Sequence, residues 1–191
     1  VATNINRGLA DLLETGSLEA KRAVLTTSPA MDIQVPSNLE RALFEATGRD
    51  PEPVAAAMAK LASDGVLTVT EKQLTRLRET YEGQAVNEEE AAAEIAEFQR
   101  EHGRLIDPHT AVGLSAARGK RDPDRPMVVM ATAHPAKFPE AVGRASGVMP
   151  ALPERFAELF DLPERITHVR NDYDLVRELV LNAAGGRDRD S

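Results

Sequence analysis

The sequence contains no cysteine. This absence excludes disulfide bonds, thiolate metal sites and cysteine nucleophiles, and it fits the reducing environment of the cytosol. No apolar run approaches the length of a membrane span. The first residues also lack the basic stretch followed by an apolar one that marks a secretory signal. We therefore expect a cytoplasmic protein with no part in a membrane.

Positive charge is scarce as well. The 23 Lys and Arg residues face 31 Asp and Glu residues, so the formal net charge is -8. A nucleic-acid binder needs basic surface to displace the counterions of phosphates, and we expect no nucleic-acid partner. With only 4 histidines and no His-x-x-x-His pair, a metal site is not expected. The sequence also lacks the Gly-x-Ser-x-Gly motif of hydrolases and a glycine-rich phosphate loop.

What the sequence does contain is typical of a soluble globular protein. Its 191 residues suffice for one domain with a buried core, and the hydrophobic and charged shares of 42% and 28% are ordinary. Helical patterns alternate with short strand-like runs, which predicts an α/β fold, helix-rich, with a small and mainly parallel sheet. Strands are expected at residues 22–26, 65–69 and 127–131. Helices are expected at residues 5–15, 39–48, 51–62, 107–118, 153–160 and 172–183, and after positions 70, 87 and 135.

Short motifs mark several of these helix starts. Ser37 and Glu40 have the spacing of a capping box, in which a hydroxyl and a carboxylate satisfy free amides at a helix start. Thr70 and Asn87 each precede an amide or acidic residue three positions later. Asp107 precedes a proline, which suits the first position of a helix. We expect a helix to begin at each of these points.

The first residues suggest that the sequence begins inside a secondary-structure element. The chain opens on Val-Ala-Thr-Asn without an initiator methionine. This apolar stub resembles the end of a buried strand whose start is missing, so we expect a fragment. Removal of the methionine from a complete protein is the alternative.

Thr132 is the candidate for ligand contact. It follows residues 127–131, a continuous apolar run that predicts a strand buried on both faces. Ligands of open α/β sheets bind beyond the carboxyl ends of the strands, where the Thr132 hydroxyl would donate or accept a hydrogen bond. The alternative is that Thr132 only caps the helix that begins near Pro135. On the residues alone, the capping role is slightly favoured.

Three further side chains have an alternative reading each. His109 and His134 lie near helix starts, where a histidine acts as acid, base or ligand, or forms hydrogen bonds that fix a loop. The second role is expected here. Lys137 has an amine of the kind that burial activates for Schiff-base chemistry. A lysine in the first turn of a surface helix is more often solvated, and that is expected here.

Three runs of the sequence resemble threonine synthase, in the same order as in that family. They are residues 28–41 (SPAMDIQVPSNLER), 106–113 (IDPHTAVG) and 131–142 (ATAHPAKFPEAV). The resemblance extends over essentially the whole chain and implies the type II pyridoxal-phosphate fold. It implies that residues 1–184 are the C-terminal part of the cofactor-binding large domain and that residues 185–191 are a disordered tail.

The resemblance also implies an activity. The family converts O-phosphohomoserine and water into threonine and phosphate, a β,γ-replacement by a carbon–oxygen lyase that uses pyridoxal 5'-phosphate as electron sink. Thr132 matches the hydroxyl residue that faces the pyridine nitrogen of the cofactor. The family's Schiff-base lysine lies in the earlier half, so Lys137 is not that residue. The implied partner is the N-terminal part of the same enzyme, and this chain alone is expected to be inactive.

One departure from the family pattern supports other readings. The family usually has Asn-x-Asn-Asp-Ile-Leu near this start, whereas this chain has Arg7 and Gly8 after Asn6. A threonine-synthase-like enzyme with another substrate is therefore one alternative. A non-catalytic interaction module is the other, because the lysine and the phosphate loop are not in the sequence.

Overall fold

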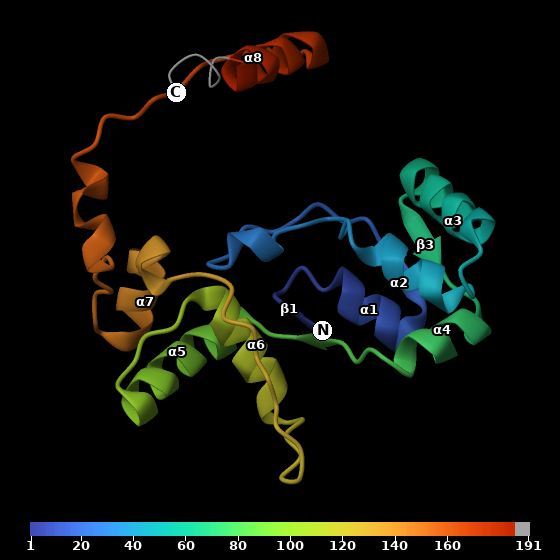
Figure 1. Cartoon of the computed structure of the whole chain (residues 1–191). Coiled ribbons are helices and arrows are strands. Elements are labelled where there is room, and N and C mark those ends of the chain that lie inside the picture. The colour runs from blue at the N-terminus through green and yellow to red at the C-terminus, as the bar shows by residue number, and fades with distance from the viewer. Residues whose placement is uncertain (186–191) are drawn as a thin grey trace. The chain divides into compact units, whose positions relative to one another are not determined.

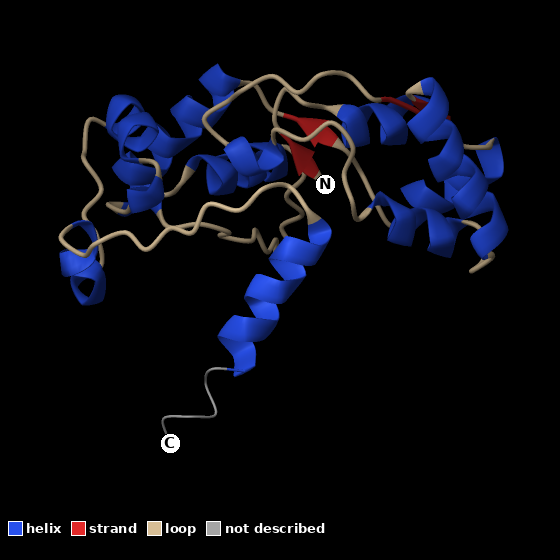
Figure 2. Ribbon diagram, turned by 90° about the horizontal axis from the view of Figure 1, so that it is seen from above, coloured by secondary structure: helices blue, strands red, loops and turns tan. Residues whose placement is uncertain are grey.

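The computed structural model describes residues 1–185. The chain divides into two compact units, Val1–Ala151 and Leu152–Ser191, which are taken separately below. The first unit has four short strands and two 3-10 turns, Pro29–Met31 and Pro135–Lys137. Its α-helices are α1 (Gly8–Thr15), α2 (Leu39–Ala46), α3 (Pro51–Asp64), α4 (Glu71–Arg78), α5 (Glu88–His102), α6 (Pro108–Arg118) and α7 (Pro139–Ser146). Helix thus outweighs strand, as predicted (Figures 1 and 2).

The strands form two separate pairs. β1 (Ala2–Thr3) runs parallel to β4 (Gln84–Ala85), and β2 (Ser17–Glu19) runs antiparallel to β3 (Val66–Thr68). The strand-like start of the chain is therefore a strand, and the strand predicted at residues 65–69 is β3. The expected helix-rich α/β architecture with a small sheet is confirmed.

The first hydrophobic core lies among α1 to α4 and the β2–β3 pair. Leu18 and Leu67 sit opposite each other in that pair, and both are fully buried. Leucines of α1, α2 and α4 pack around them. Gly16 ends α1 with a φ of +79°, a left-handed conformation that glycine adopts without strain. This core places α1 to α4 together on the right of Figure 1.

The second core lies among α5, α6 and α7. Ala111, Val112 and Val142 are fully buried at its centre, and Ala2 and Met31 pack against it from the N-terminal segment. The chain passes from the first group of helices to this one at Gly83, just before β4. A Cβ at Gly83 would lie 2.8 Å from the Cα of Ala10, so only glycine allows this close approach of β4 to α1.

The second unit contains a kinked 3-10 segment, Glu154–Phe160, and the helix α8, Tyr173–Gly185. These match the helices predicted at 153–160 and 172–183. Of the predicted disordered tail, Gly185 is the last residue of α8, and residues 186–191 lie outside the described part of the chain. No helix within residues 1–185 is long and apolar enough to cross a membrane. That residues 1–184 belong to one domain stays a prediction.

Most helix starts follow the sequence signals. Thr70 and Asn87 form complete capping boxes with the residues three positions on, and the Asp107 carboxylate caps α6. The capping box predicted at Ser37 is wrong. Helix α2 begins one residue later, after Asn38, with no side-chain cap. The amide of Leu39 instead donates to the Pro36 carbonyl, because a tight turn precedes the helix.

Two predicted strands are absent from the described residues. Residues 22–26 are extended, but their backbone bonds to side chains: the Val24 amide donates to Asn6, and the Thr26 amide donates to Asp32. Residues 127–131 are extended too, and Val128 and Met130 are 78% and 72% exposed. The apolar run predicted a buried strand, but residues 1–185 supply no neighbouring strand for it. The expectation that Thr132 follows a strand is therefore wrong for this part of the chain.

Candidate functional site

Thr132 lies at an open pocket of about 500 Å³. Helix α6 forms one wall with Gly113 and Ala116, and the extended segment 127–130 forms another. The two walls are in close contact, since a Cβ at Gly113 would lie 3.0 Å from Val129. None of the hydrogen bonds within residues 1–185 involves the Thr132 hydroxyl, and the residue is exposed. The hydroxyl is thus available to a ligand in a largely apolar hollow.

His109 lies at the same pocket and connects distant parts of the sequence. It is 6% exposed, at the start of α6. Its Nε2 accepts a hydrogen bond from the Ala30 amide at 3.1 Å, and its Nδ1 lies 2.8 Å from the Asp107 carboxylate. The ring centroid lies 4.9 Å from that of Phe138. The role predicted for His109, hydrogen bonding that fixes a loop, is confirmed.

Asp107 carries much of this arrangement. Its carboxylate is fully buried and accepts hydrogen bonds from the amide of His109 and from the hydroxyl and amide of Thr110. A buried carboxylate is costly unless it is hydrogen-bonded. The α6 N-terminus supplies the donors, and its dipole favours a negative charge at this position. The Asp-Pro motif that predicted a helix start therefore also places the anion that holds His109.

The other two candidates lie at the surface. The His134 ring accepts the Ala136 amide at 3.1 Å and so caps the 3-10 turn Pro135–Lys137. The capping role considered for Thr132 is therefore filled by His134. Lys137 is exposed, as predicted, with its amine 6.0 Å from the Phe138 ring centroid. Residues 1–185 contain no group of three or more His, Cys, Asp or Glu side chains that would hold a metal ion.

A polar network near the N-terminus was not predicted as a site. Asn4 is fully buried, and its side-chain amide donates to Asp32, Ser28 and Thr26. Asn6 also donates to Asp32, at 3.0 Å. The Asn-x-Asn run and residues 28–32 each belong to the family pattern. The hydrogen bonds between them join residues more than twenty positions apart, so the sequence alone did not reveal them. The network anchors the loop that carries Ala30 and Met31 to the end of β1.

Arg7, the departure from the family pattern, forms ion pairs along α1. Its guanidinium pairs with Asp11 and Glu14 on α1, and its side chain is 49% exposed. The hydrogen bond to Asp11 raises the pKa of Arg7 above its ordinary value, and the charge of Asp11 adds to this. Arg7 is not among the residues that line the pocket.

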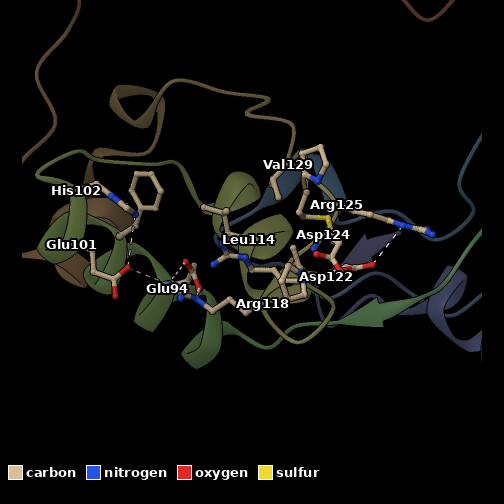
Figure 3. Close-up of a pocket in the computed structure, with 15 residues that line it drawn as sticks. Glu94, Glu101, His102, Leu114, Arg118, Asp122, Asp124, Arg125 and Val129 are labelled. Atoms are coloured by element: carbon tan, nitrogen blue, oxygen red, sulfur yellow. Dashed lines mark hydrogen bonds and ion pairs between the residues drawn. The ribbon is translucent and has the colours of Figure 1, made fainter.

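A larger hollow of about 880 Å³ lies between α5, α6 and the loop after α6 (Figure 3). Phe98, Leu114 and Val129 give it an apolar floor. Glu94 and Arg118 form a two-bond ion pair at its wall, and the second of these bonds is 2.9 Å long. Glu94 is 4% exposed, and the hydrogen bond to Glu94 raises the pKa of Arg118.

Comparison with known proteins gives a consistent result. Residues 110–180 match the family model described as "Threonine synthase, C-terminal". The chain is 41% identical over 182 residues to a threonine synthase of Pseudomonas aeruginosa, covering 94% of this chain and 39% of the relative. It is 34% identical over 190 residues to that of Corynebacterium glutamicum, covering 96% of this chain and 40% of the relative.

Solved structures agree with these relatives. The pyridoxal-phosphate-bound threonine synthase of Brucella melitensis is 44% identical, with a TM-score of 0.86 over 95% of this chain and 39% of that one. The yeast threonine synthase is 27% identical, with a TM-score of 0.83 over 97% of this chain and 42% of that one. The chain thus spans about two fifths of the length of the relatives it matches. It belongs to the threonine synthase family and corresponds to the C-terminal region of its members.

Proposed function

We propose that this chain is the C-terminal part of a threonine synthase, which binds pyridoxal 5'-phosphate and converts O-phosphohomoserine and water into threonine and phosphate. The observation that carries the proposal is the Thr132 hydroxyl, available at a largely apolar pocket in a chain with 41% identity to a threonine synthase. The cytoplasmic location expected from the cysteine-free sequence stays a prediction.

The pocket suits the pyridine ring of this cofactor. An aromatic ring suits the mainly apolar lining beside Thr132, and its nitrogen can share one hydrogen bond with a hydroxyl. When bound, pyridoxal phosphate supplies an electron sink for carbanions. Thr132 would hold the nitrogen with a neutral group, which, unlike a carboxylate, would not force a proton onto the ring. His109 and Gly113 shape the wall beside it.

The Schiff-base lysine belongs, on this proposal, to the N-terminal part of the enzyme. Lys120 also lines the pocket, but its ammonium is ion-paired with Glu82. The Lys137 amine is exposed beside Phe138. A nucleophilic amine must be uncharged and within reach of the reacting atom, and neither lysine is placed for this. The chain alone is therefore expected to lack catalysis.

The N-terminal part would also cover the exposed apolar surface. The extended residues 127–131 leave backbone groups without a neighbouring strand inside residues 1–185. Val128 and Met130 present apolar side chains at their surface. An extended segment of this kind completes a sheet when another strand is added beside it, and burial on both faces would then account for its composition.

The test is phosphate release from O-phosphohomoserine by the full product of the gene that encodes this chain, compared with residues 1–191 alone. Release by the full product and none by the chain alone is expected. Within the full product, Thr132→Val removes the hydroxyl at nearly constant shape and is expected to lower kcat about tenfold, as for the loss of one hydrogen bond. Thr132→Ser keeps the hydroxyl and is the matched control. No release by a folded, cofactor-loaded wild-type enzyme would reject this function and favour a relative with another substrate.

A further inference from the structure

We propose that His109 is a positioning residue for the Thr132 pocket: its neutral imidazole holds the loop at Ala30 in place through Nε2. The pocket's role as the cofactor site rests on the proposed function, whereas the anchoring of the loop does not. All three runs of family resemblance meet at this side chain. Ala30 belongs to the first run, Asp107 to the second and Phe138 to the third.

The partners of His109 fix which nitrogen carries the proton. The Ala30 amide is a donor, so Nε2 must be the acceptor. The proton of a neutral ring then lies on Nδ1, which donates to the Asp107 carboxylate. Asp107 is itself fully buried and bonded to Thr110, so it cannot swing away without leaving a charge unpaired. The orientation of the ring is thereby set from its Asp107 side.

The free side of the ring then determines where the loop lies. Ala30 precedes Met31, which lines the Thr132 pocket and packs against the second core. The Ala30–His109 bond spans 79 residues of sequence. The loop is also attached on both sides of Ala30. Asn4 donates to Ser28 and Asp32, and the Thr27 amide donates to Glu88. Loss of the Nε2 acceptor would therefore free the Ala30 amide in the middle of the loop while the residues on both sides stay attached.

The ring also contacts the segment that follows Thr132. Phe138 packs against it at a centroid distance of 4.9 Å, and this residue closes the turn that follows Thr132 and His134. His109 is thus in contact with the segments that carry Met31 and Thr132, and both of these residues face the pocket. One side chain thus contacts two segments that are distant in sequence and that each contribute a residue to the pocket lining.

Two substitutions separate the two nitrogens. In His109→Gln the amide oxygen reaches the place of Nε2 and can accept from Ala30, but the donor to Asp107 is lost. In His109→Asn the amide nitrogen takes the place of Nδ1 and can donate to Asp107, but nothing accepts from Ala30. Both variants lose the imidazole and its packing on Phe138. A difference between them therefore reports the hydrogen bonds and not the loss of the ring.

The experiment uses the full product of the gene. It compares both variants with wild type for hydrogen exchange of the Ala30 amide, affinity for pyridoxal phosphate by absorbance titration, and thermal midpoint. We expect similar midpoints, with Ala30 exchange and cofactor affinity near wild type in His109→Gln. We expect faster Ala30 exchange and an about tenfold weaker cofactor affinity in His109→Asn, the scale of one hydrogen bond.

Two results would overturn the proposal. Equal Ala30 exchange in the two variants would show that Nε2 does not hold the loop. Faster exchange in His109→Asn with unchanged cofactor affinity would show that the loop is held but does not shape the site. Failure of the wild-type enzyme to bind the cofactor would reject the proposed function instead, and the Ala30 exchange contrast would still decide whether His109 anchors the loop.

Discussion

Replacing Arg118 by methionine tests how strongly the ion pair to Glu94 holds α5 against α6. Methionine keeps most of the apolar stem and removes the charge. In the native chain the guanidinium donates two bonds to the Glu94 carboxylate (Figure 3). Glu94 is 4% exposed, whereas the Arg118 side chain is 42% exposed. The substitution therefore leaves a buried carboxylate without its cation.

The size of the effect follows from this unequal burial. Breaking a fully buried pair costs roughly 3–5 kcal/mol, because an unpaired charge stays in a medium of low polarity. An exposed pair contributes less than about 1 kcal/mol. Since water reaches one partner here, we expect Arg118→Met to lower the stability of the α5–α6 pair by about 2 kcal/mol. The pKa of Arg118 is raised, so the guanidinium stays charged near neutrality and loses its charge only at strongly alkaline pH. The effect should not vary with pH near neutrality.

The assay is native-state hydrogen exchange of the amides of α5 and α6 in the full gene product, which reports the free energy of local opening. Arg49→Met is the control, because Arg49 pairs with Glu45 on the surface of α2, with both side chains more than half exposed. No measurable change is expected there. The double variant Glu94→Leu with Arg118→Met replaces the pair by apolar groups and should recover most of the loss.

The reasoning is refuted if Arg118→Met changes exchange in α5 and α6 no more than Arg49→Met changes it in α2. It is also refuted if the double variant is as unstable as Arg118→Met alone, since the unpaired Glu94 charge would then not be the cause.

Two further predictions concern stability and are measured by thermal or urea unfolding of the full gene product. The Thr3 hydroxyl is buried with no partner within residues 1–185, so Thr3→Val should stabilise the protein by up to about 1 kcal/mol. Thr110→Val removes a hydroxyl bonded to Asp107 and should destabilise it by about 2 kcal/mol. Equal effects of the two substitutions would contradict the argument that a buried hydroxyl stabilises only when it is hydrogen-bonded. Asn87→Ala should cost about 1 kcal/mol by removing the α5 cap, whereas Ser37→Ala should cost almost nothing, and a loss at Ser37 would mean that it does cap α2.

The sequence predicted helix starts well where the determinants are local. Thr70, Asn87 and Asp107 each act within three residues of chain, so their caps could be identified without knowing the fold. Ser37 has the same spacing but lies in a turn fixed by Pro36, and the turn determines where α2 begins. The spacing of a capping box thus predicts a helix start only where the N-cap residue has an extended backbone, as at Thr70, Asn87 and Asp107.

The sequence predicted strands poorly because a strand requires a partner. Residues 22–26 have strand-like composition, but Asn6 and Asp32 take up their backbone groups. In the candidate site, too, the local feature was predictable and the distant contact was not. That His109 would fix a loop was predictable from its place at a helix start. That the loop would be at Ala30, 79 residues earlier, depended on the tertiary fold.

The pairing of β1 with β4 has a consequence for the order of folding. The two strands are neighbours, yet residues 4–83 separate them, and this excursion encloses the whole of the first hydrophobic core. Closing a flexible loop of that length costs on the order of 4 kcal/mol of chain entropy, which a pair of two-residue strands cannot offset. We expect α1 to α4 to collapse first and bring Thr3 and Ala85 together, so that β1 and β4 pair late. Slow folding of this region would then report the formation of the first core, since contacts distant in sequence form only after the loop between them has closed.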